Sequence, residues 1–431
     1  MSVPLDRLYH YLDDCVNHDL VIYRWWPHGS RNLEDLGPLF SYTDHQYFTR
    51  PIMICHDQEP LDVKFYNQKQ VYAIAKSFLS KHAPNWPLQD SVLNFVSTLH
   101  LLSTTFFHSV WNNVFRHRTQ ETIACISDYD LTILLHSEQR SKQVAYFSKK
   151  NCVPVYYWSH AVIALDWYRY AEHDPNLDLS ANTIDQDFLI YNRAWSGTRE
   201  YRLKLIENLV DNKLLEHCKT KFCSVDQDTH YTNHVFVNQK FKISNTQLEN
   251  YFPPNIHPSA SSADYVADDY ATTGIEVVLE TLFDDDRWHL TEKTLRPIAC
   301  GKPFMLAATA GSLQYLRNYG FETFDGLIDE SYDTISDSSE RLNAVVQEMK
   351  RIAALDSNTK HTLYTKLHEI SKRNQHRFFN GLFDQVIQEY TTNLDHAMTV
   401  MNQHRTGQHV AALQKVLQQN WIGIDEKKLT N

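Results

Sequence analysis

Residues 290–321 read LTEKTLRPIACGKPFMLAATAGSLQYLRNYGF, and this stretch decides the fold class. Thr291 is a residue type that caps helices, and the amphipathic pattern of residues 291–300 predicts a helix directly after it. The apolar run at 303–307 predicts a buried strand, and the segment from Ser312 predicts a second helix. A helix, a strand and a helix in close succession are typical of a parallel α/β sheet.

The same alternation occurs on both sides of this stretch. Helical patterns cover residues 137–150, beginning at Ser137, then 199–215, and most of the chain after about residue 338. A further helix is expected within 92–107. Apolar runs that predict strands are 51–55, 131–136, 153–158, 188–192 and, with alternating faces, 274–283.

The predicted fold class is therefore α/β, with two doubly wound Rossmann-like domains and a helical C-terminal segment. The polar, turn-rich segment 170–187 places the boundary between the domains. We expect an N-terminal domain over 1–185, a C-terminal domain over 186–340, and helices over 341–431 that pack back across the N-terminal domain. Ligands of such domains bind at the carboxyl ends of the strands, and two facing domains form a cleft.

Bulk composition narrows the class of protein. The chain has 431 residues and a net charge of −11, which disfavours a protein that coats nucleic acid. Its seven cysteines include no CxxC pair, which indicates free thiols in a reducing compartment. The sequence shows neither a signal peptide nor an apolar run near the ~18 residues of a membrane span. We therefore expect a cytoplasmic protein with no membrane partner, in the host cytoplasm if a phage encodes it; oligomeric state is left open.

Two predicted helix starts are suited to an anionic ligand. A helix N-terminus offers free amides and the positive end of the helix dipole, which favour phosphate. At the first start, Thr291 caps the helix, Lys293 adds a positive charge, and Glu292 can accept hydrogen bonds from the hydroxyls of a ribose. Gly311 and Ser312 open the second helix and offer another set of backbone amides.

The order Thr-Glu-Lys at 291–293, amphipathic helix, Gly-x-Pro at 301–303 and apolar strand resembles the donor-binding segment of GT-B glycosyltransferases, including fucosyltransferases. The longer form, running on to GFETFDGLIDESYD at 320–333, is similar to a family of glycosyltransferase-like proteins frequent in tailed phages. Two further segments of that family, around 51–62 and 188–215, have counterparts here. The resemblance implies the GT-B architecture and transfer of a sugar from a nucleotide-diphosphate sugar, with UDP-sugars favoured.

Within that resemblance, the C-terminal domain holds the nucleotide. The Asn-Arg pair at 192–193 opens this domain, and Arg193, Arg199 and Arg202 cluster around one predicted strand-to-helix loop. Guanidinium groups pair well with a diphosphate, which is also the leaving group. The expected donor-binding residues are Arg193, Arg199, Arg202, Glu292, Lys293, Thr291, Gly311 and Ser312.

The N-terminal domain is expected to supply the acceptor site and the catalytic base. The sequence HDQEP at 56–60 follows an apolar strand, where a loop facing the cleft should lie. An inverting transfer needs a group that takes the proton from the acceptor hydroxyl. Asp57 is the first candidate for this base, Glu59 the second and His56 the third. Other acids near strand ends, and two histidines that can face the cleft, are open alternatives: Asp128, Asp130, Glu138, His136 and His160.

Other chemistries have weaker support in the sequence. The acidic run DDDRW at 284–288 is compatible with a divalent metal but is more often a solvated turn, so a metal is not required. The sequence contains no Walker loop, GxGxxG, HExxH or GxSxG pattern. The preferred acceptor is a hydroxymethylated pyrimidine in double-stranded phage DNA. Alternatives are a protein, a glycan or a small molecule as acceptor, or a module that binds nucleotide without catalysis.

Overall fold

The structure is a computed structural model, and it describes residues 21–24, 52–56, 60, 132–150, 152–177, 179, 184–245, 248 and 264–404. The chain divides into two compact units. One unit contains Trp158–Ile387. The other contains the strands β1–β4, the helix α6 and the end of the helix α14. The division falls between Tyr157 and Trp158, upstream of the segment 170–187 that we had taken as the boundary.

The N-terminal unit is built on a parallel sheet with the order β1-β2-β3-β4. Its strands are β1 (Val21–Arg24), β2 (Ile52–His56), β3 (Thr132–His136) and β4 (Cys152–Tyr156). The helix α6 (Lys142–Lys150) connects β3 to β4, as a parallel pair requires. Buried side chains of the sheet include Met53, Leu134 and Val155.

The last helix of the chain also belongs in part to this unit. α14 (Leu382–His404) begins in the C-terminal unit and ends in the N-terminal unit. Asn393 Nδ2 donates to the carbonyl oxygen of Tyr156 over 2.7 Å. The rings of Tyr390 and Tyr157 are 5.0 Å apart. These contacts attach the second half of α14 to the end of β4.

The C-terminal unit contains a second parallel sheet with the order β10-β9-β5-β6. Its strands are β5 (Gln186–Asn192), β6 (Cys218–Phe222), β9 (Thr273–Leu279) and β10 (Phe304–Ala307). β5 and β9 are central and almost fully buried, as expected for parallel strands covered by helices on both faces. A separate antiparallel pair joins β7 (Val225–Asp226) to β8 (Thr229–His230).

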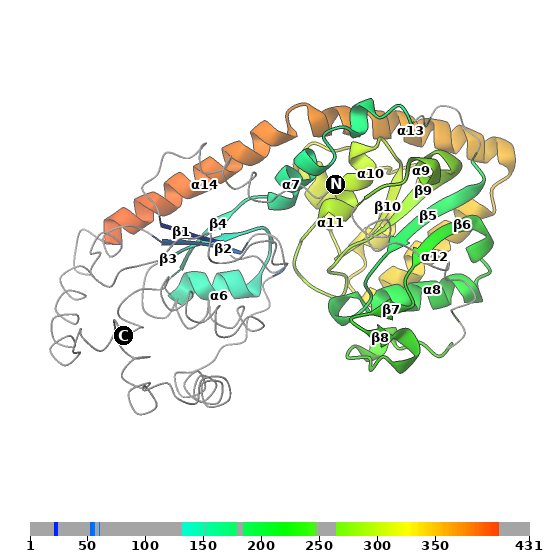
Figure 1. The fold of residues 1–431 in the computed structure, drawn as a ribbon, viewed down its shortest axis with the longest axis horizontal. Helices are drawn as coiled ribbons and strands as arrows, with labels where there is room; N and C mark the ends of the chain where they lie inside the picture. Colours follow the sequence, from blue (N-terminus) through cyan, green and yellow to red (C-terminus); the bar gives the residue numbers. More distant parts are fainter. Residues whose placement is uncertain are drawn as a thin grey trace, which may run out of the picture. The chain divides into compact units, whose positions relative to one another are not determined.

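Helices cover both faces of this second sheet. Figure 1 shows α8 (Tyr201–Asp211) and α12 (Ser338–Ala353) on one side, and α10 (Glu292–Ala299) and α13 (Ser357–Phe379) on the other. α10 also packs on α7 (Ser159–Trp167). The remaining helices are α9 (Ala267–Thr272), α11 (Ser312–Asn318) and the short 3-10 turns Ala171–His173, Gly197–Arg199, Leu215–His217, Tyr231–Asn233, Gln239–Phe241 and Glu330–Thr334. Within the described residues, no helix combines the length and the apolar character needed to cross a membrane.

The α/β class with parallel sheets and a helical C-terminal segment is confirmed. All six predicted strands are present, with ends shifted by a few residues, and the predicted helices over 199–215, 291–300 and after 338 form. The expected helix within 92–107 lies outside the described residues. The prediction of alternating faces for 274–283 is wrong, because every residue of β9 is buried.

The helix predicted over 137–150 begins later than the sequence indicated. Ser137 was expected to cap it, but α6 starts at Lys142. Arg140 has a positive φ of 62°, a conformation that cannot continue a right-handed helix. Ser141 Oγ instead accepts from the backbone N–H of Val144 over 3.2 Å, so Ser141 supplies the cap.

Candidate functional site

The carboxyl ends of β5 and β9 mark the point where the second sheet changes direction. From β5 the chain passes through α8 to β6 on one side, and from β9 it passes through α10 to β10 on the other. Ligands of open parallel sheets bind in the crevice at such a switch point. Arg193 directly follows β5, and Glu280 directly follows β9. The switch point therefore lies among the residues that the sequence singled out.

Arg202 is buried at this edge of the sheet, beside the ends of β5 and β9. It comes from α8, and its side chain is 2% exposed. Its guanidinium donates to Asn192 Oδ1 and to the carbonyl oxygen of Ala194, over 2.8 and 2.6 Å. It also donates to the carbonyl oxygens of Leu279 and Glu280, over 2.6 and 2.9 Å. Arg202 thus ties the ends of β5 and β9 together, and these four bonds engage both of its terminal nitrogens.

A buried carboxylate holds the start of α10 at the same edge. Glu280 is fully buried, and its oxygens accept from the backbone N–H of Thr291, from Thr291 Oγ1 and from Thr294 Oγ1, over 2.8, 2.8 and 2.6 Å. Thr291 in turn accepts from the backbone N–H of Lys293 over 3.3 Å. The prediction that Thr291 caps the helix is confirmed. Glu280 fixes the first turn of α10 against β9.

Glu292 and Lys293 directly follow Thr291 in the sequence, and their side chains remain partly accessible. Their side chains are 16% and 19% exposed, and Lys293 Nζ lies 2.8 Å from Glu292 Oε1. His160 of α7 approaches the other oxygen, with Nδ1 3.4 Å from Glu292 Oε2. Burial by itself would raise the pKa of Glu292, but the charge of Lys293 and the interaction with His160 outweigh it and hold that pKa well below its usual range. Glu292 is consequently an ionised acceptor at neutral pH.

The second predicted anion site is already capped by the chain itself. Gly311 precedes α11 with a φ of +85°, and a Cβ there would lie 3.0 Å from Trp288. Asp333 Oδ2 accepts from the backbone N–H of Leu313 over 3.1 Å, and the Asp333 carbonyl accepts from Gly311 over 2.8 Å. Ser312 is fully buried and donates through Oγ to Thr309. A carboxylate of the protein therefore stands where a ligand phosphate was expected.

The loop after β5 is held in place by Asp226. Its Oδ2 accepts from the backbone N–H groups of Trp195 and Ser196 over 2.9 and 2.7 Å. Burial would raise the pKa of Asp226, but the hydrogen bonds from Ser196 and Trp195 and the charge of Arg199 lower it on balance. Arg193 is exposed and Arg199 half-buried on this loop. Both arginines are thus carried on a fixed backbone at the switch point.

The predicted catalytic residues fall mostly outside the described part of the chain. Asp57 and Glu59, with Asp128 and Asp130, are among the residues that the structure does not describe. His56 was expected in the loop, but it is the last residue of β2 and pairs in register with His136 at the end of β3. The base assignment therefore stays a prediction.

Two of the alternatives proposed for that base can be placed. His136 Nδ1 lies 3.0 Å from the carbonyl oxygen of Glu138, and the side chain of Glu138 is 2% exposed. His160 belongs to the C-terminal unit, where it pairs with Glu292 and contacts the ring of His289 at 5.1 Å.

The acidic run at 284–288 is paired within the protein. Asp285 accepts from the backbone, Nε and Nη2 of Arg287, the last over 2.7 Å. Asp284 accepts from Asn238 Nδ2 over 2.6 Å. No group of three potential metal ligands occurs within the described residues. Hydrogen bonds from Arg287 and Asn238 thus hold the acidic run in place.

Sequence reasoning missed three groups that shape this edge. Glu280 stands one residue beyond a buried strand, and that position is a usable signal. Asp226 and Asp333 act on segments 30 and 20 residues away, and local pattern gives no hint of such contacts. Comparison with models of protein families, with curated proteins and with solved structures finds no match for this chain.

Proposed function

We propose that the protein is a nucleotide-sugar-dependent glycosyltransferase whose donor site lies at the carboxyl edge of the second sheet. One observation carries this proposal: the partly accessible pair Glu292–Lys293 and the loop of Arg193 and Arg199 stand at the ends of neighbouring strands, at the switch point. This is where the resemblance of the Thr-Glu-Lys segment to GT-B enzymes expects the nucleotide.

The chemistry of these groups fits a nucleoside diphosphate. Arg193 and Arg199 provide guanidinium groups for the diphosphate, whose charge increases as it leaves. Glu292 is ionised and can accept from both ribose hydroxyls. Lys293 adds a positive charge at the start of α10. Arg202 acts in this scheme as the support that keeps the ends of β5 and β9 together.

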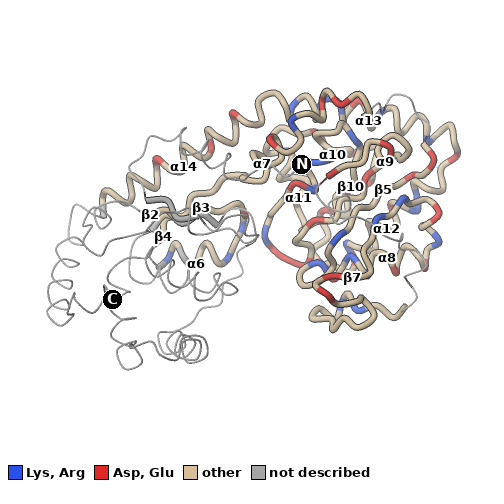
Figure 2. Tube along the Cα trace, viewed as in Figure 1, with Lys and Arg blue, Asp and Glu red and all other residues tan. Residues whose placement is uncertain are grey.

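The acceptor half of the reaction rests on the segment that follows β2. We propose that Asp57, or else Glu59 or His56, takes the proton from an acceptor hydroxyl, and that transfer is inverting. The proposed acceptor is a hydroxymethylated pyrimidine in DNA. Figure 2 shows Lys and Arg interspersed with Asp and Glu along the described chain. A brief contact with DNA would therefore depend on a local groove rather than on a basic face.

Donor binding is the first test. UDP, GDP, ADP and CDP are titrated by calorimetry into the wild type, Glu292→Gln and Arg193→Gln. We expect saturable binding of one diphosphate, weakened about 10-fold by each variant, a loss of about 1.4 kcal/mol. Glu340→Gln and Arg373→Gln, on exposed positions of α12 and α13, should stay within about 2-fold of the wild type. A folded wild type that binds none of the four would refute the donor site.

Transfer is tested next with the sugar form of the diphosphate that binds. Plain DNA, hydroxymethylated DNA, a protein mixture and small glycans are compared as acceptors. Product on hydroxymethylated DNA alone supports the proposal. Product on another acceptor corrects the acceptor but keeps the reaction class, and donor binding without any product indicates a binding module. Asp57→Ala should abolish transfer and leave donor affinity unchanged; if Asp57→Ala, Glu59→Ala and His56→Ala all keep full activity, the base lies elsewhere.

A further inference from the structure

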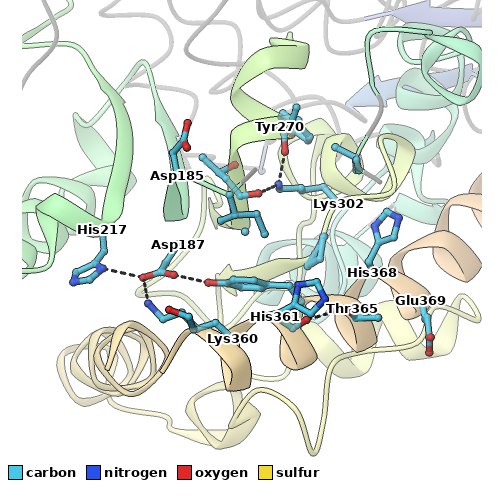
Figure 3. A pocket seen from close by; sticks show the side chains of 18 of the residues that line it. Asp185, Asp187, His217, Tyr270, Lys302, Lys360, His361, Thr365, His368 and Glu369 are labelled. Atoms are coloured by element: carbon cyan, nitrogen blue, oxygen red, sulfur yellow. Dashed lines mark hydrogen bonds and ion pairs between the residues drawn. The ribbon is translucent and has the colours of Figure 1, made fainter. Parts of the chain in front are cut away.

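A second cavity lies at the opposite edge of the C-terminal sheet. It encloses about 560 Å³ at the amino ends of β5, β9 and β10, and one face of α13 closes it (Figure 3). This volume is in the range of small-molecule sites. The residues used below are Asp187 of β5, Lys302 before β10, and Lys360, Tyr364, His368 and Lys372 of α13.

One end of the cavity is closed by a saturated carboxylate. Asp187 accepts from Tyr364 Oη over 2.6 Å and from Lys360 Nζ over 2.7 Å, and His217 Nδ1 lies 2.9 Å from it. Figure 3 shows His217 and Lys360 converging on Asp187. This cluster attaches α13 to the start of β5. Because its charges are matched internally, it leaves little to offer a ligand.

The other end holds a buried ammonium group. Lys302 is 3% exposed, and its Nζ donates to the carbonyl oxygens of Tyr270, over 2.5 Å, and of Thr273. Within the described part of the chain, no carboxylate oxygen lies within 4.0 Å of this Nζ. Glu276, the buried carboxylate whose charge acts on Lys302, is itself paired with Arg296. A cation buried without a counter-ion is costly, and an anion in the cavity would reduce that cost.

Two more basic groups surround the same end. His368 and Lys372 are one turn apart on α13 and both line the cavity. Burial first, and then the charges of Lys372 and Lys302, lower the pKa of His368, against the raising effect of the Gly301 backbone. Nε2 of His368 is buried and has no hydrogen-bond partner among the described residues. The remaining acids of the cavity, Asp185 and Glu369, are exposed to solvent and thus screened.

We propose that this cavity is a second binding site, which takes the phosphate group of a small phosphorylated molecule against Lys302, His368 and Lys372. Three donors that approach from β10 and α13 suit the several acceptor oxygens of a phosphate better than the planar pair of a carboxylate. The volume beyond them leaves room for the rest of the molecule. The site is independent of the proposed donor site, because it uses the amino ends of the strands and not their carboxyl ends.

Binding at this site is coupled to proton uptake. Burial lowers the pKa of Lys302 to about 7, against the smaller raising effects of Glu276 and Cys300. A bound phosphate favours the protonated forms of Lys302 and His368 and raises the pKa of both. Near pH 7.5, Lys302 and His368 therefore take up protons when phosphate binds, while monoanionic phosphate that binds as the dianion releases protons, and affinity falls as the pH rises further.

The test uses inorganic phosphate and the full chain. Calorimetry near pH 7.5 in buffers of different ionisation enthalpy measures both affinity and net proton exchange. We expect saturable binding, and an affinity reduced about 5-fold or more by Lys372→Gln and by His368→Gln. Lys366→Gln, an exposed change of the same charge on α13 that does not line the cavity, should stay within about 2-fold.

The two sites are separated by crossing the variants. Lys372→Gln should leave nucleoside diphosphate binding unchanged, and Arg193→Gln should leave phosphate binding at this cavity unchanged. Failure of the diphosphate titration alone affects only the donor site. The second site is overturned if phosphate does not bind or if Lys366→Gln weakens binding as much as Lys372→Gln does. Lys372 is exposed on α13, so circular dichroism and melting temperature of Lys372→Gln should match the wild type.

Discussion

The two edges of the second sheet differ in how their buried charged side chains are paired. At the carboxyl edge, the buried charges are matched by groups of the protein: Arg202 by four acceptors, and Glu280 by donors from α10. At the amino edge, Asp187 is matched in the same manner, but Lys302 is buried with carbonyl partners only. At the carboxyl edge, the buried Arg202 and Glu280 form a frame that supports the accessible groups of the proposed donor site. At the amino edge, the cavity contains a buried positive charge without a matching negative charge.

The strongest test of the frame is Arg202→Met. The change removes the donor to Asn192 Oδ1 and to the carbonyl oxygens of Ala194 and Leu279, whereas the carbonyl of Glu280 still accepts from Tyr201 Oη. We expect a loss of about 3–5 kcal/mol of unfolding free energy. Urea denaturation measures it. Arg193→Met, an exposed arginine on the adjacent loop, should cost less than about 0.5 kcal/mol. Similar losses for the two variants would mean that Arg202 does not hold the edge together.

The matching test at the amino edge is Asp187→Ala. This variant removes the acceptor shared by Tyr364, Lys360 and His217, and it should cost about 2–3 kcal/mol. The neighbouring Asp185→Ala removes an exposed carboxylate, with an expected loss below about 0.5 kcal/mol. If chemical denaturation shows no difference between them, the cluster does not attach α13 to β5.

The third test is Asp333→Asn, whose effect on stability depends on pH. Burial raises the pKa of Asp333 to about 6, so the folded protein binds a proton more tightly than the unfolded chain, whose aspartates titrate near about 3.9. The wild type therefore loses stability as the pH rises from about 4 through about 6. Asn carries no such proton, so Asp333→Asn should gain up to about 3 kcal/mol relative to the wild type over that range.

Denaturation curves near pH 4, 6 and 7.5 check this prediction. The difference between the two proteins should change in one direction and level off above about pH 7. A constant difference would show that folding does not shift the pKa of Asp333.

Sequence pattern was a good guide to elements and a poor guide to distant contacts. Apolar runs located β2–β5, β9 and β10, and Thr291 identified the start of α10 correctly. β6 was missed because its sequence, CKTKF, alternates polar residues with few apolar ones. Arg202 was predicted to bind the donor, and pattern alone could not show that its guanidinium is turned onto the main chain. Lys302 was passed over because a lysine after a glycine gives no sign of its burial.

The course of α14 has a consequence for how the protein is made. The N-terminal unit is discontinuous in sequence, since its strand β4 contacts Tyr390 and Asn393 near the other end of the chain. Among the described residues, the C-terminal unit draws only on Trp158–Ile387. During synthesis, the C-terminal unit has its full sequence before the ribosome has delivered the last piece of the N-terminal one. The part of the protein that is translated first is therefore completed last.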